Sequence, residues 1–163
     1  MLSKTMQDAF GAHINHELYS SYLYLSMSLY FEGRSLPGFA RWMRIQSTEE
    51  NSHGMKMLDH VLDRGGSVTL QAIEQPAADF KSALDVFERT VAHEQKITAE
   101  INALYATAMK ENDFASMEML QWFIKEQVEE EKNSNLILEQ LKLAGDKGSS
   151  LVMLDHRMGK RGS

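Results

Sequence analysis

The chain has 163 residues, of which 43% are hydrophobic and 25% charged, and its formal net charge is -6. This length suffices for one domain with a substantial core, and the composition is that of an ordinary globular protein. We therefore expect residues 1–163 to form a single domain. The absence of cysteine excludes disulfides, cysteine-based zinc sites and iron–sulfur clusters. The acidic balance disfavours nucleic acid as a partner and favours cations.

Membrane insertion and export are not expected from this sequence. No stretch of about 18 apolar residues is present, so the sequence predicts no transmembrane helix and no membrane partner. Residues 1–5 lead directly into an amphipathic pattern, without the charged start and apolar stretch of a signal peptide. We expect a cytoplasmic protein.

Helical periodicity and end signals predict four long helices, at about residues 5–33, 36–64, 82–112 and 115–144. Ser35 is positioned to cap the second helix, and Pro37 suits its first turn. Ser82 and Asp85 have the spacing of a capping box at the start of the third helix. A short amphipathic piece at 149–157 predicts a fifth helix.

The connections between these helices predict the topology. Only a few residues join the first helix to the second and the third to the fourth, so each pair should be an antiparallel hairpin. The link at 66–81 contains Pro76 and a strand-like segment at 68–70. At about 3.3 Å per residue it can return along the whole bundle. The sequence therefore predicts an all-α four-helix bundle with one long crossover and a short C-terminal fifth helix.

Polar residues interrupt the core-facing seam of every helix near its middle. Along the seams, read in steps of three and four, the interrupting residues are Glu17, Glu50, His53, Glu94, Gln127 and Glu130. Buried carboxylates without partners are costly, whereas two divalent cations would balance four glutamates beside a neutral histidine. This oxygen-rich set with one imidazole suits iron or manganese and would also take zinc.

The same residues lie in motifs that resemble those of bacterial non-haem ferritins. The motifs are NHELYSSYLY at 15–24, EENSH at 49–53, Glu94, and QVEEE at 127–131. Their order and spacing match the family along nearly the whole chain. The resemblance implies an iron-storage ferroxidase that oxidises Fe(II) to Fe(III) with dioxygen or hydrogen peroxide and deposits ferric mineral inside a homo-oligomeric shell of 24 subunits.

The resemblance also implies a role for each residue of the interrupted seams. The ligands of a first iron would be Glu17, Glu50 and His53, with Glu50 bridging to a second iron. That second ion would be held by Glu94 and Glu130, with Gln127 beside it. Tyr24 matches a tyrosine next to the centre, where it could hydrogen-bond a ligand or supply an electron.

A third iron site is implied at Glu49, Glu126 and Glu129, although a solvated acidic face would explain these residues as well. Haem is not expected. A bacterioferritin would carry its haem-ligating methionine where this chain has Asn51, and a second Glu-x-x-His where this chain has Gln127 and Glu130.

The remaining residues receive simpler interpretations. His13, His16 and His60 could contact iron transiently, but we interpret them as surface or interface polar residues. We interpret the basic residues at 157–161 as a frayed end. An outward apolar row on the first helix, Leu18, Tyr22, Leu25 and Leu29, indicates oligomerisation.

Two other function classes remain open at this point. A different di-iron enzyme, such as a rubrerythrin-like peroxidase or an oxygenase, would use a similar centre, although rubrerythrins carry a cysteine-rich module. A purely structural helical bundle would bind no metal.

Overall fold

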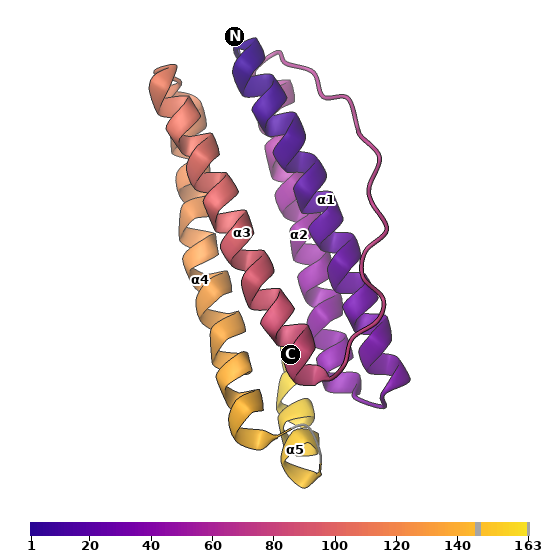
Figure 1. The fold of residues 1–163 in the computed structure, drawn as a ribbon. Helices are drawn as coiled ribbons and strands as arrows, with labels where there is room; N and C mark the ends of the chain where they lie inside the picture. Colours follow the sequence, from indigo (N-terminus) through magenta and orange to yellow (C-terminus); the bar gives the residue numbers. More distant parts are fainter. Residues whose placement is uncertain (146–147, 163) are drawn as a thin grey trace.

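The computed structural model describes residues 1–145 and 148–162, and within them it consists of helices without strands (Figure 1). The helices are α1 (Lys4–Gly33), α2 (Pro37–Asp63), α3 (Ala83–Lys110), α4 (Phe114–Ala144) and α5 (Ser149–Met158). The predicted elements are confirmed, with boundaries displaced by two residues at most. None of the described helices combines the length and apolar character required to cross a bilayer.

The topology contains the predicted crossover. Figure 1 shows α1 and α2 as one antiparallel hairpin, α3 and α4 as another, and the long link running beside α1 from one end of the bundle to the other. Consequently α3 starts at the end where α2 starts and runs parallel to it. The Ser26 hydroxyl donates to the Ala77 carbonyl at 2.7 Å and fastens the link to α1. The strand-like segment at 68–70 forms no strand, because the link runs beside a helix, which offers no strand edge for pairing.

The helix ends are stabilised partly as predicted. The Ser82 hydroxyl accepts from the Asp85 N–H at 3.1 Å, and the Asp85 carboxylate accepts from the N–H of Lys81 rather than of Ser82. The prediction that Ser35 caps α2 is wrong. Ser35 has a φ of 57°, and Leu36 precedes the helix without a side-chain cap. Pro37 at the first helical position has no N–H that would need a partner.

The apolar core is divided into two clusters along the bundle. The cluster near α5 is aromatic, with the rings of Phe31 and Phe39 stacked 5.0 Å apart and Phe87 against both. The other cluster, at the opposite end, includes Phe10 and Phe123. Every long helix passes from one cluster to the other, and the residues between the clusters are the polar seam residues. The fold therefore holds these side chains at one level in a dry interior.

Helix α5 docks on the start of α2. The Asp155 carboxylate accepts from the backbone N–H of Phe39 at 2.9 Å, which satisfies a free donor in the first turn of α2. The contact is so close that a Cβ at Gly38 would lie 1.7 Å from the Asp155 carbonyl oxygen. Position 38 therefore requires glycine.

Substituting Gly38→Ala should displace α5 and lower the melting temperature, because the clash is with backbone that cannot rotate away; overpacking of this kind costs about 1–3 kcal/mol. Thermal unfolding and limited proteolysis near residues 145–148 measure both effects. Gly11→Ala is the matched control, since a Cβ there meets nothing within 4 Å and alanine should strengthen α1. Equal melting temperatures for Gly38→Ala and the wild type would refute the docking.

Candidate metal centre

The polar seam residues converge in the middle of the bundle. All of them are buried, with at most 6% of each residue exposed: Glu17 from α1, Glu50 and His53 from α2, Glu94 from α3, and Gln127 and Glu130 from α4. A carboxylate seldom occupies such a position without a partner. The burial predicted from the seams is therefore observed.

Glu17, Glu50 and His53 form a compact group of metal-ligating atoms. One ligand atom from each lies within 4.8 Å of the others. The His53 Nδ1 atom is 3.3 Å from Glu50 Oε2 and 3.9 Å from Glu17 Oε2. The spacing of Glu50 and His53 places both on one face of α2, opposite Glu17.

Glu94 and Glu130 lie on the α3–α4 side of the same interior, where amides and a phenol hold them. The Glu94 carboxylate accepts from the Tyr24 hydroxyl, and from Gln127 Nε2 at 3.1 Å. Glu130 accepts from Gln46 Nε2 at 3.0 Å, and the same nitrogen donates to Glu50 at 2.7 Å. Gln46 thus joins the two sides of the centre. Gln46 lies one turn before Glu50 on α2, and the sequence analysis did not assign it this role.

One buried oxygen in the centre is left without a partner. Glu17 Oε2 accepts no hydrogen bond although it is fully enclosed. Leaving such an acceptor unpaired costs about 1–3 kcal/mol. A cation bound between Glu17, Glu50 and His53 would satisfy this oxygen and neutralise the carboxylates. The residues present therefore fit a site for multivalent cations.

The protonation of the centre reflects the crowding of its charges. Burial, together with the charge of a neighbouring carboxylate, raises the pKa of Glu50 to about 7, of Glu94 to about 8 and of Glu130 to about 7. Burial would lower the pKa of His53, but the adjacent Glu50 and Glu17 raise it to about 9. Burial would raise the pKa of Glu17, but the hydrogen bond to His13 and the charges of His13 and His53 together outweigh burial and lower it. Without metal the centre therefore retains protons that bound cations would displace.

The expected third site is not assembled in the same way. Glu49 and Glu126 are half-buried and Glu129 is exposed, and within residues 1–145 and 148–162 they do not form a group with ligand atoms inside 4.8 Å. The Glu49 carboxylate pairs instead with the Arg161 guanidinium. Iron binding at these three residues stays a prediction.

The interpretation of the basic C-terminal residues as a frayed end is wrong for Arg161. Its guanidinium lies 4.3 Å from the centroid of the Trp42 ring and donates to Gln46 Oε1 at 2.9 Å. Since Gln46 also holds Glu50 and Glu130, the end of the chain supports the centre from outside. The contact joins residues 115 positions apart, so no local sequence signal could have indicated it.

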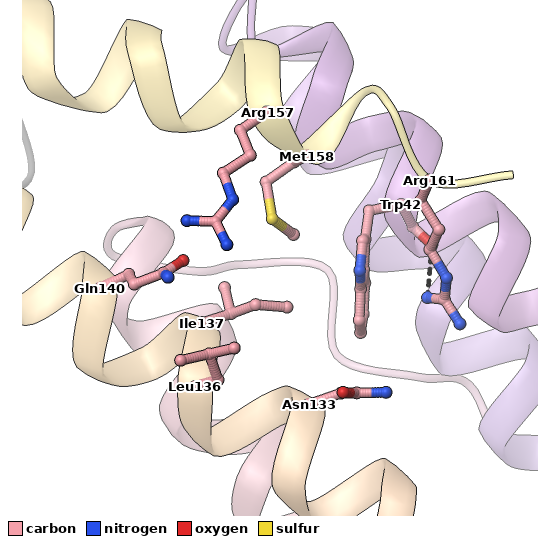
Figure 2. A pocket seen from close by; sticks show the side chains of 8 residues that line it. All are labelled: Trp42, Asn133, Leu136, Ile137, Gln140, Arg157, Met158 and Arg161. Carbon is pink, nitrogen blue, oxygen red and sulfur yellow. Dashed lines mark hydrogen bonds between the residues drawn. The ribbon is translucent and has the colours of Figure 1, made fainter. Parts of the chain in front are cut away.

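A pocket of about 270 Å³ lies beside Arg161 (Figure 2). Its lining comes from α4, from α5 and the C-terminal segment after it (residues 159–162), and from α2 through Trp42. The residues are Trp42, Asn133, Leu136, Ile137, Gln140, Arg157, Met158 and Arg161. These side chains include neither a carboxylate nor a histidine, so the pocket offers poor ligands for a hard cation. This pocket is therefore not a candidate metal site.

The metal-free protein should lose stability as the pH rises from about 5 to about 9. The native pKa values of Glu50, Glu94 and Glu130 exceed the unfolded value of 4.5, and that of His53 exceeds 6.5. Over this range the native state therefore binds more protons than the unfolded state, and raising the pH favours unfolding. Three groups act in the opposite sense. The lowered pKa of Glu17 does so only on acidification below about 4.5. Burial lowers the pKa of His93 to about 4 and also lowers that of His60, so these histidines offset part of the loss of stability up to about pH 6.5, against the four groups that cause it.

Thermal unfolding with a chelator should show a decrease of at least about 5 °C across that range. The decrease should be smaller in Glu94→Gln, which permanently carries a neutral group there, and unchanged in the control Glu139→Gln, on the exposed face of α4. A melting temperature that rises with pH would contradict this electrostatic account.

Three comparisons relate this geometry to known proteins. A family model described as Ferritin-like domain matches residues 7–144. A protein of Bacteroides fragilis named bacterial non-heme ferritin is 38% identical over 161 residues, covering 99% of this chain and 100% of that protein. A protein of the same name from Campylobacter jejuni is 38% identical over 155 residues, covering 95% of this chain and 93% of its own.

Solved structures show the same likeness. One, described as a novel open pore ferritin from the hyperthermophilic archaeon Archaeoglobus fulgidus, has a TM-score of 0.97, 45% sequence identity and 99% coverage of both chains. An engineered closed form of the ferritin from that organism also has a TM-score of 0.97 and 45% identity, with 99% of this chain and 98% of that chain covered. With the buried carboxylate centre and the one-crossover bundle, these likenesses place the chain in the ferritin family.

Proposed function

We propose that this protein stores iron and is a ferroxidase, oxidising Fe(II) to Fe(III) at the buried centre and depositing ferric mineral inside a protein shell. The observation that carries the proposal is the convergence of four glutamates and one histidine in a dry interior, with Glu17 Oε2 left unpaired. The relatives named bacterial non-heme ferritin support it.

The residues of the centre form two ligand sets, one for each of two Fe(II) ions that bind as substrate. Glu17, Glu50 and His53 are suited to hold the first ion, and Glu94 and Glu130 the second, with Glu50 between them. Anionic carboxylate oxygen stabilises Fe(III) over Fe(II) and so favours transfer of electrons to dioxygen or hydrogen peroxide. The fold keeps both ions within bridging distance.

The neighbours of the ligands fix their orientation. Burial and the nearby carboxylates raise the pKa of Tyr24 well above its ordinary value, so the phenol stays protonated and donates to Glu94. Gln127 and Gln46 donate to Glu94 and Glu130. Because these groups donate without adding a negative charge, they hold the carboxylates without competing with them for the metal.

Storage requires a closed assembly, and we propose a homo-oligomer of 24 chains in the cytoplasm, working without haem. Three members of the outward row on α1 are exposed in the single chain: Tyr22 by 49%, Leu25 by 36% and Leu29 by 60%. A continuous apolar row of this kind calls for a partner surface. The archaeal structure named an open pore ferritin supports the same arrangement.

Variants Glu17→Ala and His53→Ala should assemble normally but oxidise Fe(II) about tenfold more slowly or worse, because each removes a ligand of the first ion. Initial rates are followed by the absorbance of the ferric product. Assembly is followed by size-exclusion chromatography, where 24 chains of 18.5 kDa elute at about 440 kDa. Glu139→Ala, on an exposed part of α4, is the control and should match the wild type in both measurements.

Two outcomes would refute the proposal. Wild-type rates in both variants would remove the buried centre from the reaction. Elution of the wild type as a small oligomer that oxidises Fe(II) without accumulating mineral would favour a di-iron peroxidase or oxygenase over a storage protein. Metal analysis after aerobic loading separates both from a structural bundle, which would retain no iron.

A further inference from the structure

A second group of metal-ligating side chains lies in the groove between α1 and α3. It consists of His13 and His16 from α1 and Glu100 from α3, and one ligand atom from each lies within 4.8 Å of the others. In the part of the chain that the structure describes, only this group and the Glu17–Glu50–His53 group have that geometry. From the sequence, both histidines were interpreted as surface or interface polar residues, with transient contact to iron as the alternative.

The ligand atoms point to a common position. His16 Nδ1 is 2.7 Å from Glu100 Oε2, and His13 Nδ1 is 3.8 Å from the same oxygen. These atoms border a pocket of about 230 Å³, whose walls include the small side chains of Ala9, Ala12 and Ala103. The His16 side chain is 44% exposed and that of Glu100 23%, so an ion can reach them from solvent.

His13 is already oriented as a metal ligand. It is only 4% exposed, and its Nε2 atom is 2.8 Å from Glu17 Oε1. An ionised carboxylate can only accept a hydrogen bond, so Nε2 carries a proton, and in the neutral imidazole Nδ1 then keeps its lone pair, on the side of Glu100. Metal-bound histidines are typically fixed in this way, with the other ring nitrogen donating to a carboxylate. Lys96, 3.7 Å from Glu100 Oε1, leaves Oε2 available for the ion.

We propose that His13, His16 and Glu100 bind one divalent first-row transition ion on the α1–α3 face of the bundle. Two imidazole nitrogens and one carboxylate oxygen suit Zn²⁺ or Fe²⁺ and leave a coordination position for water. The same set is poor for Mg²⁺ and Ca²⁺, which take oxygen ligands. The site is new relative to the buried centre, because its ligands are different residues and none comes from α2 or α4.

The position of this outer site connects it with the interior. Glu17 binds His13 through Oε1, and its Oε2 belongs to the group formed with Glu50 and His53. One imidazole and one carboxylate therefore separate an ion in the groove from the buried centre. An ion bound in the groove holds the His13 ring, and through it Glu17, in one orientation. Binding in the groove does not itself depend on the proposed ferroxidase function.

Crystals of the assembled protein soaked separately in Zn²⁺ and, anaerobically, in Fe²⁺ would test the site by anomalous diffraction at each metal's edge. We expect a peak about 2.0–2.2 Å from His13 Nδ1, His16 Nδ1 and Glu100 Oε2 in at least one soak. The two soaks distinguish a zinc site from one that takes iron. The peak should disappear in His16→Ala and remain in His156→Ala, whose exposed histidine lies on α5.

Binding stoichiometry in solution provides a second measurement. The wild type and His156→Ala should bind one more Zn²⁺ per chain than His16→Ala, with melting temperatures equal before metal is added. In His53→Ala the groove peak should persist, so failure of the buried centre is distinguishable from failure of this site. Absence of a groove peak from both soaks of the wild type, or its persistence in His16→Ala, would overturn the proposal.

Discussion

The structure depends on placing several like charges in a dry interior. Four glutamates from four helices face one another where water cannot screen them, and the protein itself compensates them with the imidazoles of His53 and His13, the donors Gln46, Gln127 and Tyr24, and retained protons. Such an arrangement is unfavourable until cations replace the protons. The same feature that weakens the empty bundle thus favours the binding of multiply charged cations.

The rest of the fold compensates for the buried charges and holds the carboxylates in place. Two apolar clusters, one on each side of the buried polar seam residues, supply the hydrophobic burial that these polar residues cannot provide. Gln46, Gln127 and Tyr24 orient carboxylates from neighbouring helices, so that the helices are joined through the centre as well as through the core. Arg161 extends this support to the end of the chain by holding Gln46 from outside. The result is a rigid frame around groups that would otherwise move apart.

Glu17 has a particular place in this frame because each of its oxygens belongs to a different environment. Oε2 is unpaired and faces Glu50 and His53, whereas Oε1 holds His13. His13 in turn borders the groove between α1 and α3, where His16 and Glu100 are half-buried and reachable from solvent. The centre is therefore linked to the two sides of the bundle by different means: through Glu17 and His13 to the α1–α3 groove, and through Gln46 and Arg161 to the C-terminal segment.

The sequence by itself determined three features. Periodicity and end signals gave the helices, and the lengths of the connections gave the crossover. Helix geometry converts regular spacing into a common face, which gave the level at which the polar seam residues lie: Glu17, Glu50, His53, Glu94, Gln127 and Glu130. The tertiary structure decided contacts that have no regular spacing. Arg161 meets Gln46 across 115 positions and His16 meets Glu100 across 84, and only the packing of helices sets such distances. It likewise decided that Ser35 leaves α2 uncapped and that the segment at 68–70 forms no strand. A cap depends on the conformation of one residue and a strand on a neighbouring strand to pair with, and the chain itself records neither.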